Sequence, residues 1–178
     1  MKKRGDGRAA LLVAARAEFE RHGYDGTNTN EIARSAGYVP QTFYRHFSDK
    51  CAVFIAVYEH WVQEELALLS NITSAEAAAD ILISHHRQHR VFRRSLQVLT
   101  ATNSEVAMIR AKMRLQQVKN LSDRLDSFAS LDLAEQLAAI LRIERLCDAA
   151  ADGEFNTCGV SDGSVRSLIV ACIQDLGL

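Results

Sequence analysis

The sequence predicts an all-helical protein, and three observations point to that fold class. Apolar residues recur at helical spacing along most of the chain, and no long segment shows the strict alternation that is typical of a strand. The 178 residues are 48% hydrophobic, which suits a packed core. Only one proline and nine glycines interrupt them. We expect about nine helices, three in an amino-terminal domain and the rest in a second helical domain.

Charge is distributed unevenly along this chain. The formal net charge is −1, but residues 1–50 hold nine Lys or Arg and six Asp or Glu and so carry +3, which leaves −4 on residues 51–178. A basic amino-terminal part is typical of a surface that faces nucleic acid. Lys2, Lys3 and Arg4 form a basic arm before the first expected helix, which runs from about residue 8 to residue 22.

The segment 27–50 predicts two short helices and a tight turn. Asn28 is a suitable N-cap, and Glu31 three residues later completes a capping box. Gly37 stands where a helix ends in a left-handed residue, and Pro40 suits the first position of the next helix. Two helices joined in this way form a helix-turn-helix motif, whose second helix can enter the major groove of DNA.

The second helix of the motif separates aromatic from polar side chains. Phe43 and Phe47 lie four residues apart and are expected in the core, and the polar residues around them face outward. Gln and Arg can bind base edges and Thr a thymine methyl, whereas Tyr, His and Lys can bond to phosphates. The candidate DNA-binding residues are Asn28, Thr29, Asn30, Pro40, Gln41, Thr42, Tyr44, Arg45, His46 and Lys50.

Three segments in this region also resemble the tetracycline-repressor (TetR) family of bacterial transcription regulators. They are AARAEFERHGYDGTN, EIARSAG and TFYRHFSDK, and they cover about the first third of the chain. The resemblance implies a homodimeric DNA-binding repressor with a ligand-binding carboxy-terminal domain and no cofactor. Two residues depart from the family pattern. Val39 replaces a Ser or Thr cap, so Pro40 alone must start the second helix, and Cys51 replaces an acidic residue that would complete a box with Ser48.

We therefore divide the chain into a DNA-binding domain, residues 1–50, and an effector-binding and dimerisation domain, residues 51–178. A helix over residues 49–69 connects the two. Further helices are expected near residues 73–89, opened by a Thr73–Glu76 capping box, and near 91–101, 104–129, 131–151 and 161–176. The candidate pocket residues are Phe54, Trp61, Phe92, Met108 and Met113.

The last two expected helices are predicted to form an intermolecular four-helix bundle in the dimer. The interface residues would be Val165, Leu168, Ile169 and Cys172, which share one stripe of the final helix. The alternative is that both helices complete the core of the monomer, and the resemblance favours the dimer.

The remaining residues offer little for catalysis or metal binding. His85 and His89 are four apart and could share a helix face, but no acidic or Cys partner lies nearby in the sequence, so we expect no metal site. The four cysteines are widely spaced and are interpreted as reduced thiols of a cytoplasmic protein. No catalytic motif and no membrane span is recognisable, so we expect neither an enzyme nor a membrane partner.

Two hypotheses of different class remain. The first is a repressor that binds a palindromic operator in double-stranded DNA as a homodimer and is released by an unidentified small-molecule effector. The second is a helical small-molecule-binding or scaffolding protein with an architectural helix-turn-helix. The outward polar set around Gln41 and Arg45 favours the first hypothesis, because an architectural motif does not need it.

Overall fold

The described part of the chain, residues 6–178 of a computed structural model, is helical throughout and confirms the predicted fold class. It holds eleven helices where about nine were expected, because the four-residue α8 and α10 interrupt segments that were expected to be one long helix and a loop. The basic arm at Lys2, Lys3 and Arg4 lies outside the described residues. The helices are α1 (Asp6–His22), α2 (Thr29–Ser35), α3 (Pro40–Tyr44), α4 (Lys50–Leu69), α5 (Ala75–Gln88), α6 (Arg90–Thr102), α7 (Ser104–Ser122), α8 (Asp126–Ala129), α9 (Leu133–Asp152), α10 (Glu154–Thr157) and α11 (Asp162–Gln174).

The chain folds into two compact units. The amino-terminal unit contains the residues up to Trp61 together with Val91–Ile109, and the carboxy-terminal unit contains Val62–Arg90 and Arg110–Leu178. Helices α4 and α7 are divided between the two units, and α6 contributes its first residue, Arg90, to the carboxy-terminal unit. The functional division at residue 50 stays a prediction, because compactness does not report where contacts with DNA or ligand end.

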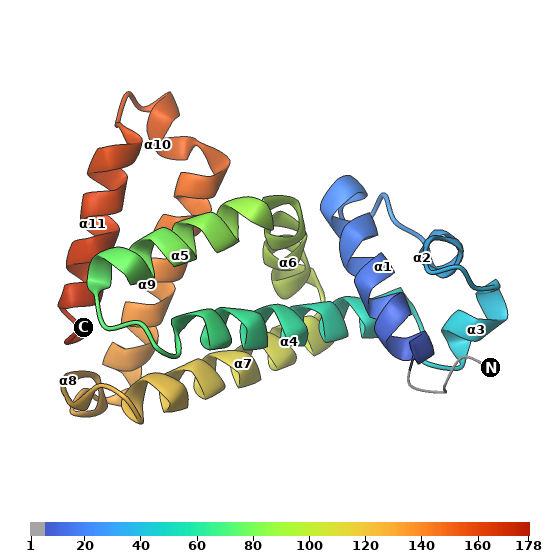
Figure 1. Cartoon of the computed structure of the whole chain (residues 1–178), viewed down its shortest axis with the longest axis horizontal. Helices are drawn as coiled ribbons and strands as arrows, with labels where there is room; N and C mark the ends of the chain where they lie inside the picture. The colour runs from blue at the N-terminus through green and yellow to red at the C-terminus, as the bar shows by residue number, and fades with distance from the viewer. Residues whose placement is uncertain (1–5) are drawn as a thin grey trace. The chain divides into compact units, whose positions relative to one another are not determined.

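Aromatic side chains hold the amino-terminal unit together. The Phe19 ring of α1 packs edge-on against the Phe54 ring of α4, with ring centroids 5.1 Å apart. The centroid of the Phe54 ring lies 4.8 Å from that of the Phe92 ring of α6. The backbone N–H of Tyr24 donates to Ser95 Oγ at 3.0 Å, which ties the loop after α1 to α6. In Figure 1, α1, α2 and α3 lie together on this framework as the blue to cyan ribbons.

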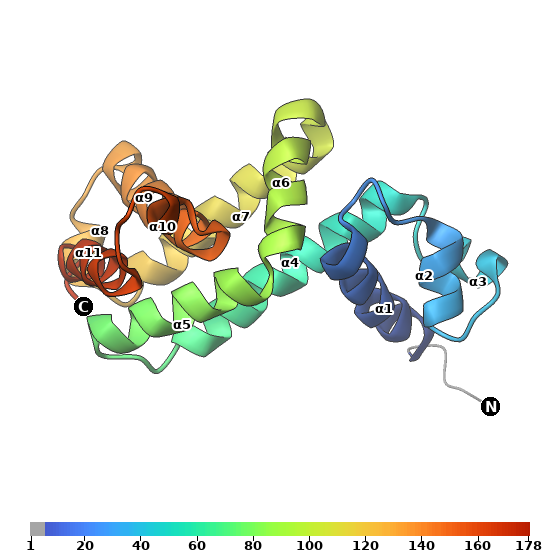
Figure 2. The same ribbon diagram turned by 90° about the horizontal axis from the view of Figure 1, so that it is seen from above.

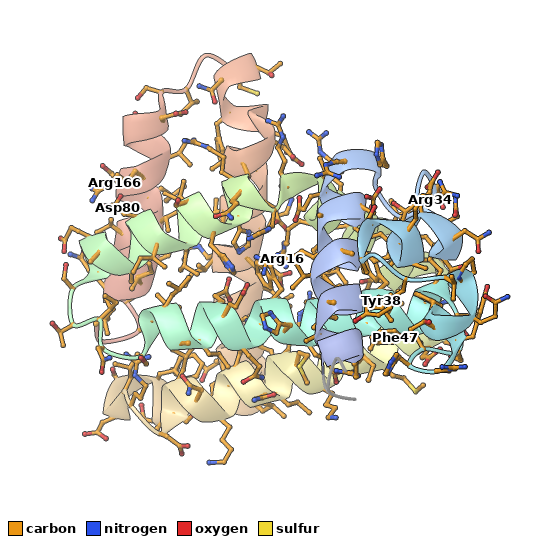
Figure 3. The ribbon with its side chains drawn as sticks, turned by 45° about the vertical axis from the view of Figure 1, so that its right-hand side comes forward. Arg16, Arg34, Tyr38, Phe47, Asp80 and Arg166 are labelled. Carbon is orange, nitrogen blue, oxygen red and sulfur yellow. The ribbon has the colours of Figure 1, made fainter. Side chains whose placement is uncertain are left out.

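In the carboxy-terminal unit, α5, α9 and α11 pack against one another (Figure 2). Their shared core includes Ala79, Cys147 and Ile169, none of which is exposed. At the surface, the Arg166 guanidinium of α11 binds the Asp80 carboxylate of α5 through two contacts of 2.6 and 2.8 Å (Figure 3). This pairing holds the pKa of Asp80 below its usual value.

Two helix starts differ from the predicted caps by one residue. Ser74, and not Thr73, caps α5 by accepting a hydrogen bond from the N–H of Ala77. Asp49 accepts from the N–H of Ala52 at 2.8 Å and so caps α4 without the missing acidic residue at position 51. Among the described residues, no helix is long and apolar enough to cross a membrane.

Candidate nucleic-acid interface

Local hydrogen bonds define the turn between α2 and α3. Asn28 caps α2, since its side-chain oxygen accepts from the N–H of Glu31 at 3.0 Å. At the other end, Gly37 has φ 76° and its N–H bonds to the Arg34 carbonyl at 2.9 Å, while the Tyr38 N–H bonds to the Ala33 carbonyl at 2.8 Å. This pair of bonds is a Schellman motif, as the position of the glycine predicted.

Helix α3 starts on Pro40 alone, as predicted. Val39 is its N-cap residue and makes no side-chain cap hydrogen bond. The helix has five residues, and the chain then continues in a turn to Phe47. Phe43 is 0% exposed and Phe47 5%, and their ring centroids lie 5.7 Å apart. These two rings anchor the short helix from behind and leave its opposite side to solvent.

The outward side of α3 carries most of the polar set expected from the sequence. Gln41, Tyr44 and Arg45 are exposed, whereas Thr42 and His46 are half-buried. Tyr44 also shares a hydrogen bond of 3.0 Å with the Thr29 hydroxyl, which joins the end of α3 to the start of α2. Gln41 and Arg45 are therefore the exposed residues of this side whose chemistry suits base edges.

Several of the other candidates have structural roles as well. A methyl group added at Gly7 of α1 would lie 2.9 Å from His46 Nε2, so the His46 ring packs on the α1 backbone. The Lys50 ammonium donates to the carbonyls of Tyr24 and Thr27 at 2.7 and 2.9 Å and lies 4.1 Å from the Tyr24 ring centroid. Asn30 and Pro40 are exposed.

Glu18 of α1 fixes the position of α2 from inside the unit. Glu18 is 6% exposed. Its carboxylate accepts hydrogen bonds from Ser35 Oγ at 2.7 Å and from the Arg21 guanidinium at 3.3 Å. Its backbone carbonyl accepts from the Thr27 hydroxyl at 3.2 Å, just before the Asn28 cap. Because these contacts hold both ends of α2, the motif is firmly attached to α1.

Three exposed residues of this unit were not among the DNA-binding candidates predicted from the sequence. Arg8 of α1 places its guanidinium 5.1 Å from the Phe47 ring centroid, beside the segment that follows α3. Arg34 lies on the exposed side of α2 (Figure 3), and Val39 is 61% exposed immediately before Pro40. Two signals in the sequence could have identified two of them. Arg8 is a cation in the first turn of the first helix, and Val39 is an aliphatic residue at an N-cap position.

A comparison with protein families assigns this motif. The sequence model of "Bacterial regulatory proteins, tetR family" matches residues 11–57, which span α1 to the first turns of α4. Through this region the chain is similar to the TetR family. It is accordingly a DNA-binding transcriptional regulator, which confirms that part of the first hypothesis.

Solved structures extend the similarity of fold to the whole of this chain. Salmonella enterica GusR superposes with a TM-score of 0.75 at 16% identity, over 100% of this chain and 99% of that one. A putative TetR-family regulator from Rhodococcus sp. gives 0.71 at 17%, over 97% and 98%. A putative regulator from Saccharomonospora viridis, in complex with choline, gives 0.69 at 16%, over 96% and 97%. No curated protein sequence matches the chain significantly.

The residues expected to line an effector pocket differ in their exposure and in the compact unit to which they belong. Phe54 and Phe92 contact each other in the amino-terminal unit, and Trp61 is 2% exposed with the Arg93 guanidinium 4.7 Å from its ring centroid. Met108 is 66% exposed. Met113 is buried and belongs to the carboxy-terminal unit, so a pocket shared by the five side chains stays a prediction.

Three of the four residues predicted at the dimer interface lie inside the single chain. Val165, Ile169 and Cys172 are 3%, 0% and 4% exposed, and the first two belong to the core shared by α5, α9 and α11. For these three residues the structure supports the alternative, a stripe that completes the monomer core. Leu168 is 40% exposed, and Leu141 on the neighbouring α9 is 41% exposed.

The structure also places an acidic residue beside His85 and His89. Glu64 of α4 lies against His85 and His89, and one possible ligand atom from each of the three is within 4.8 Å of the other two. All three residues belong to the carboxy-terminal unit. Sequence reasoning missed Glu64 because it precedes His85 by 21 residues on a different helix.

Proposed function

We propose that this chain is a homodimeric transcriptional repressor that binds a palindromic operator and is released by a small molecule. The observation that carries the proposal is the exposed side of α3, where Gln41 and Arg45 stand free of the core while Phe43 and Phe47 anchor the helix behind them. The side chains that suit base recognition are thus presented on a helix that the rest of the unit holds in place.

In the proposed complex, α3 lies in the major groove. Arg45 binds guanine O6 and N7, and Gln41 binds adenine N6 and N7, because these planar side chains match those edges. Arg8 and Lys50 bond to phosphates and set the register of the motif without reading sequence. Val39 contacts a thymine methyl, which an exposed aliphatic side chain suits.

The test measures operator affinity of single variants on the DNA upstream of this chain's own gene. Arg45→Ala and Gln41→Ala should each weaken binding by about 1–3 kcal/mol and relax sequence preference, because each removes a bidentate base contact. A gel shift or fluorescence anisotropy titration at fixed salt gives the affinity, and competition with scrambled DNA gives the preference.

Matched controls separate base contacts from general effects of charge or fold. Arg87→Ala removes an exposed arginine of α5, and Gln63→Ala removes an exposed glutamine of α4, so both should leave operator affinity unchanged. Unchanged affinity in Arg45→Ala and Gln41→Ala would contradict the assignment of α3. A wild-type chain with no preference for any DNA would instead favour the scaffolding hypothesis.

The proposed dimer uses the exposed apolar residues of α9 and α11. Leu141 and Leu168 lie on neighbouring helices and remain accessible after the chain has folded. Exposed leucines on two packed helices are suited to a four-helix bundle formed with a second copy. Two copies would present two α3 helices, which a palindromic operator with half-sites about 34–36 Å apart requires.

The proposed effector is a small molecule that prefers the form of the dimer that cannot bind DNA. The choline complex of the Saccharomonospora viridis regulator offers an example of a small ligand bound by a protein of the same fold. Helix α4 is the proposed link, because it contributes residues to both compact units and begins directly after the DNA-binding motif. The regulator would act in the cytoplasm, where its operator is accessible.

A further inference from the structure

Two buried histidines and one glutamate form a cluster that DNA binding does not use. His85 and His89 are 6% and 3% exposed, and Glu64 is half-buried. The two imidazoles lie one helical turn apart at the end of α5, with ring centroids at 4.9 Å and planes at 80°. One possible ligand atom from each of the three residues lies within 4.8 Å of the others.

Two imidazole nitrogens and one carboxylate oxygen are a ligand set that suits zinc and other divalent transition metals. Around a tetrahedral ion with bonds of about 2.0–2.1 Å, ligand atoms are about 3.3 Å apart. The three atoms must therefore move together by at most about 1.5 Å. Glu64 is only half-buried, so its side chain has room to rotate toward the two imidazoles.

A second carboxylate lies where it would orient one of these ligands. Glu65 Oε2 is 3.5 Å from His85 Nδ1, and Glu65 Oε1 accepts a hydrogen bond from Gln117 at 3.1 Å. Metal-bound histidines characteristically donate their other ring N–H to a carboxylate, which fixes the tautomer and strengthens the ligand. This arrangement assigns His85 Nε2 to the ion and gives Glu65 a supporting role.

The adjacent histidine is engaged elsewhere. His86 Nδ1 lies 2.8 Å from Asp148 Oδ1, and His86 Nε2 lies 3.4 Å from Glu65 Oε2. Both ring nitrogens of His86 therefore face carboxylates, and this residue is not a ligand. Together with Glu64, the region holds three carboxylates in or near the protein interior, where negative charge is costly unless it is paired or coordinates a cation.

We propose that Glu64, His85 and His89 bind one divalent transition-metal ion, of which Zn²⁺ is the best match. Three protein ligands leave a fourth position for water or for a donor atom of a small molecule. The competing explanation is that the histidines and carboxylates form a hydrogen-bonded cluster that takes up and releases protons but binds no metal ion.

The experiment measures Zn²⁺ binding by the full-length chain in the absence of DNA, so that its outcome does not depend on the proposed repressor function. The Cys158→Ser background removes the exposed thiol, which is a competing zinc ligand. Equilibrium dialysis gives stoichiometry and affinity, and Co²⁺ substitution gives an absorption spectrum that reports coordination geometry. We expect one ion per chain with a four-coordinate Co²⁺ spectrum.

Conservative variants test the ligand assignment without removing side-chain volume. Glu64→Gln and His89→Gln should each weaken Zn²⁺ binding by more than ten-fold, because even the loss of a supporting residue outside the ligand set typically costs 10–100-fold. Glu76→Gln and His22→Gln alter an exposed glutamate and an exposed histidine and should bind Zn²⁺ as the background does. Circular dichroism confirms that each variant is folded before titration.

Acidification supplies a second readout. Zn²⁺ affinity should fall as the solution is acidified, because protonated imidazole cannot coordinate a metal. The proposal is overturned if the folded background chain binds no Zn²⁺ or Co²⁺. It is equally overturned if Glu64→Gln and His89→Gln bind Zn²⁺ as tightly as the two controls, or if pH alters stability while no metal binds.

Discussion

At the scale of single residues, Lys50 shows how one side chain supports the recognition motif. Its ammonium holds the Tyr24 and Thr27 carbonyls, which flank the loop that leads into α2. The Tyr24 ring lies beneath it, and burial, with added repulsion from Cys51 and Asp49, raises the pKa of Tyr24 to about 12. The Tyr24 ring therefore stays neutral near pH 7, and two of the three Lys50 donors are already engaged.

Lys50→Ala should reduce both stability and DNA binding. We expect the free energy of unfolding to fall by about 1.5–3 kcal/mol, as for hydrogen bonds to a charged group, and binding to all DNA sequences to weaken alike. If the third donor also bonds to a phosphate, the slope of log affinity against log salt should flatten by about one. Urea unfolding and salt-dependent anisotropy measure the two effects.

Lys112→Ala is the matched control, because Lys112 is an exposed lysine of α7. A Lys50→Ala chain as stable as this control would contradict the support that we assign to the two carbonyl bonds. An unchanged salt slope combined with lower stability would restrict Lys50 to the structural role and remove it from the phosphate contacts.

At the scale of elements, α3 is too short to be stable by itself. A five-residue helix cannot repay the cost of helix nucleation, so its stability must come from its surroundings. Pro40 fixes its first residue, Phe43 buries its inner side, and the Schellman motif at Gly37 sets the chain direction that leads into it. The conformation of Gly37 therefore decides where α3 points.

Two glycine substitutions should have opposite effects on stability. Gly37→Ala should lower the free energy of unfolding by about 1–2 kcal/mol, because φ 76° is a left-handed conformation that alanine avoids. No atom crowds the new methyl, so the effect is conformational. Gly163→Ala, in the first turn of α11 and with ordinary contacts, should raise it by about 0.5 kcal/mol.

Thermal or urea unfolding of both variants checks the prediction. DNA affinity of Gly37→Ala should fall as well, since the turn aims α3, while that of Gly163→Ala should stay at the wild-type value. Equal stability changes of the same sign in the two variants would show that the left-handed turn is not what stabilises the motif.

At the scale of the whole molecule, the proposed function requires two copies of the chain and communication within each. Leu141 and Leu168 are the exposed residues that we assign to the contact between copies. Trp61, the only tryptophan in the sequence, is the last residue of the part of α4 that belongs to the amino-terminal unit. The first feature can be tested by the oligomeric state of the chain alone, and the second needs an inducing ligand and operator DNA.

Leu168→Glu should give a folded monomer that has lost high-affinity operator binding. Leu168 is 40% exposed, so the chain tolerates the charge, but a dimer would bury it unpaired. Leu115→Glu, at a site of α7 that is 50% exposed, is the control and should remain dimeric. Sedimentation velocity distinguishes the two states, and an intact Leu168→Glu dimer would rule out this interface.

An inducing ligand should change Trp61 emission and lower operator affinity together. The ring is buried against Tyr58 and the Arg93 guanidinium, so a shift of α4 or α6 alters its surroundings. We expect a coupling of about 1–3 kcal/mol, and by linkage the operator must weaken ligand binding by the same factor. A ligand that releases operator while emission stays constant would separate the switch from this part of α4. Ligand affinity that operator DNA leaves unchanged would refute ligand-induced release.

Features that depend on neighbours within a few residues could be predicted from the sequence. The Asn28 cap, the left-handed Gly37 and the start of α3 at Pro40 all stand where the pattern placed them. Each is set by backbone geometry and by hydrogen bonds that reach at most five residues along the chain. Phe43 and Phe47 were predictable for a similar reason, because their spacing places both on one side of the segment.

The sequence pattern could not predict which helix surfaces pack against one another, and this became visible only in the folded chain. The stripe on α11 indicated an apolar side but not its partner, and α5 and α9 of the same chain cover Val165 and Ile169. Glu64 reaches His85 and His89 because packing brings α4 against the end of α5, which no local spacing encodes. The hydrophobic effect rewards burial without direction, so a periodic pattern specifies that a side is covered and leaves its partner to the packing of the whole fold.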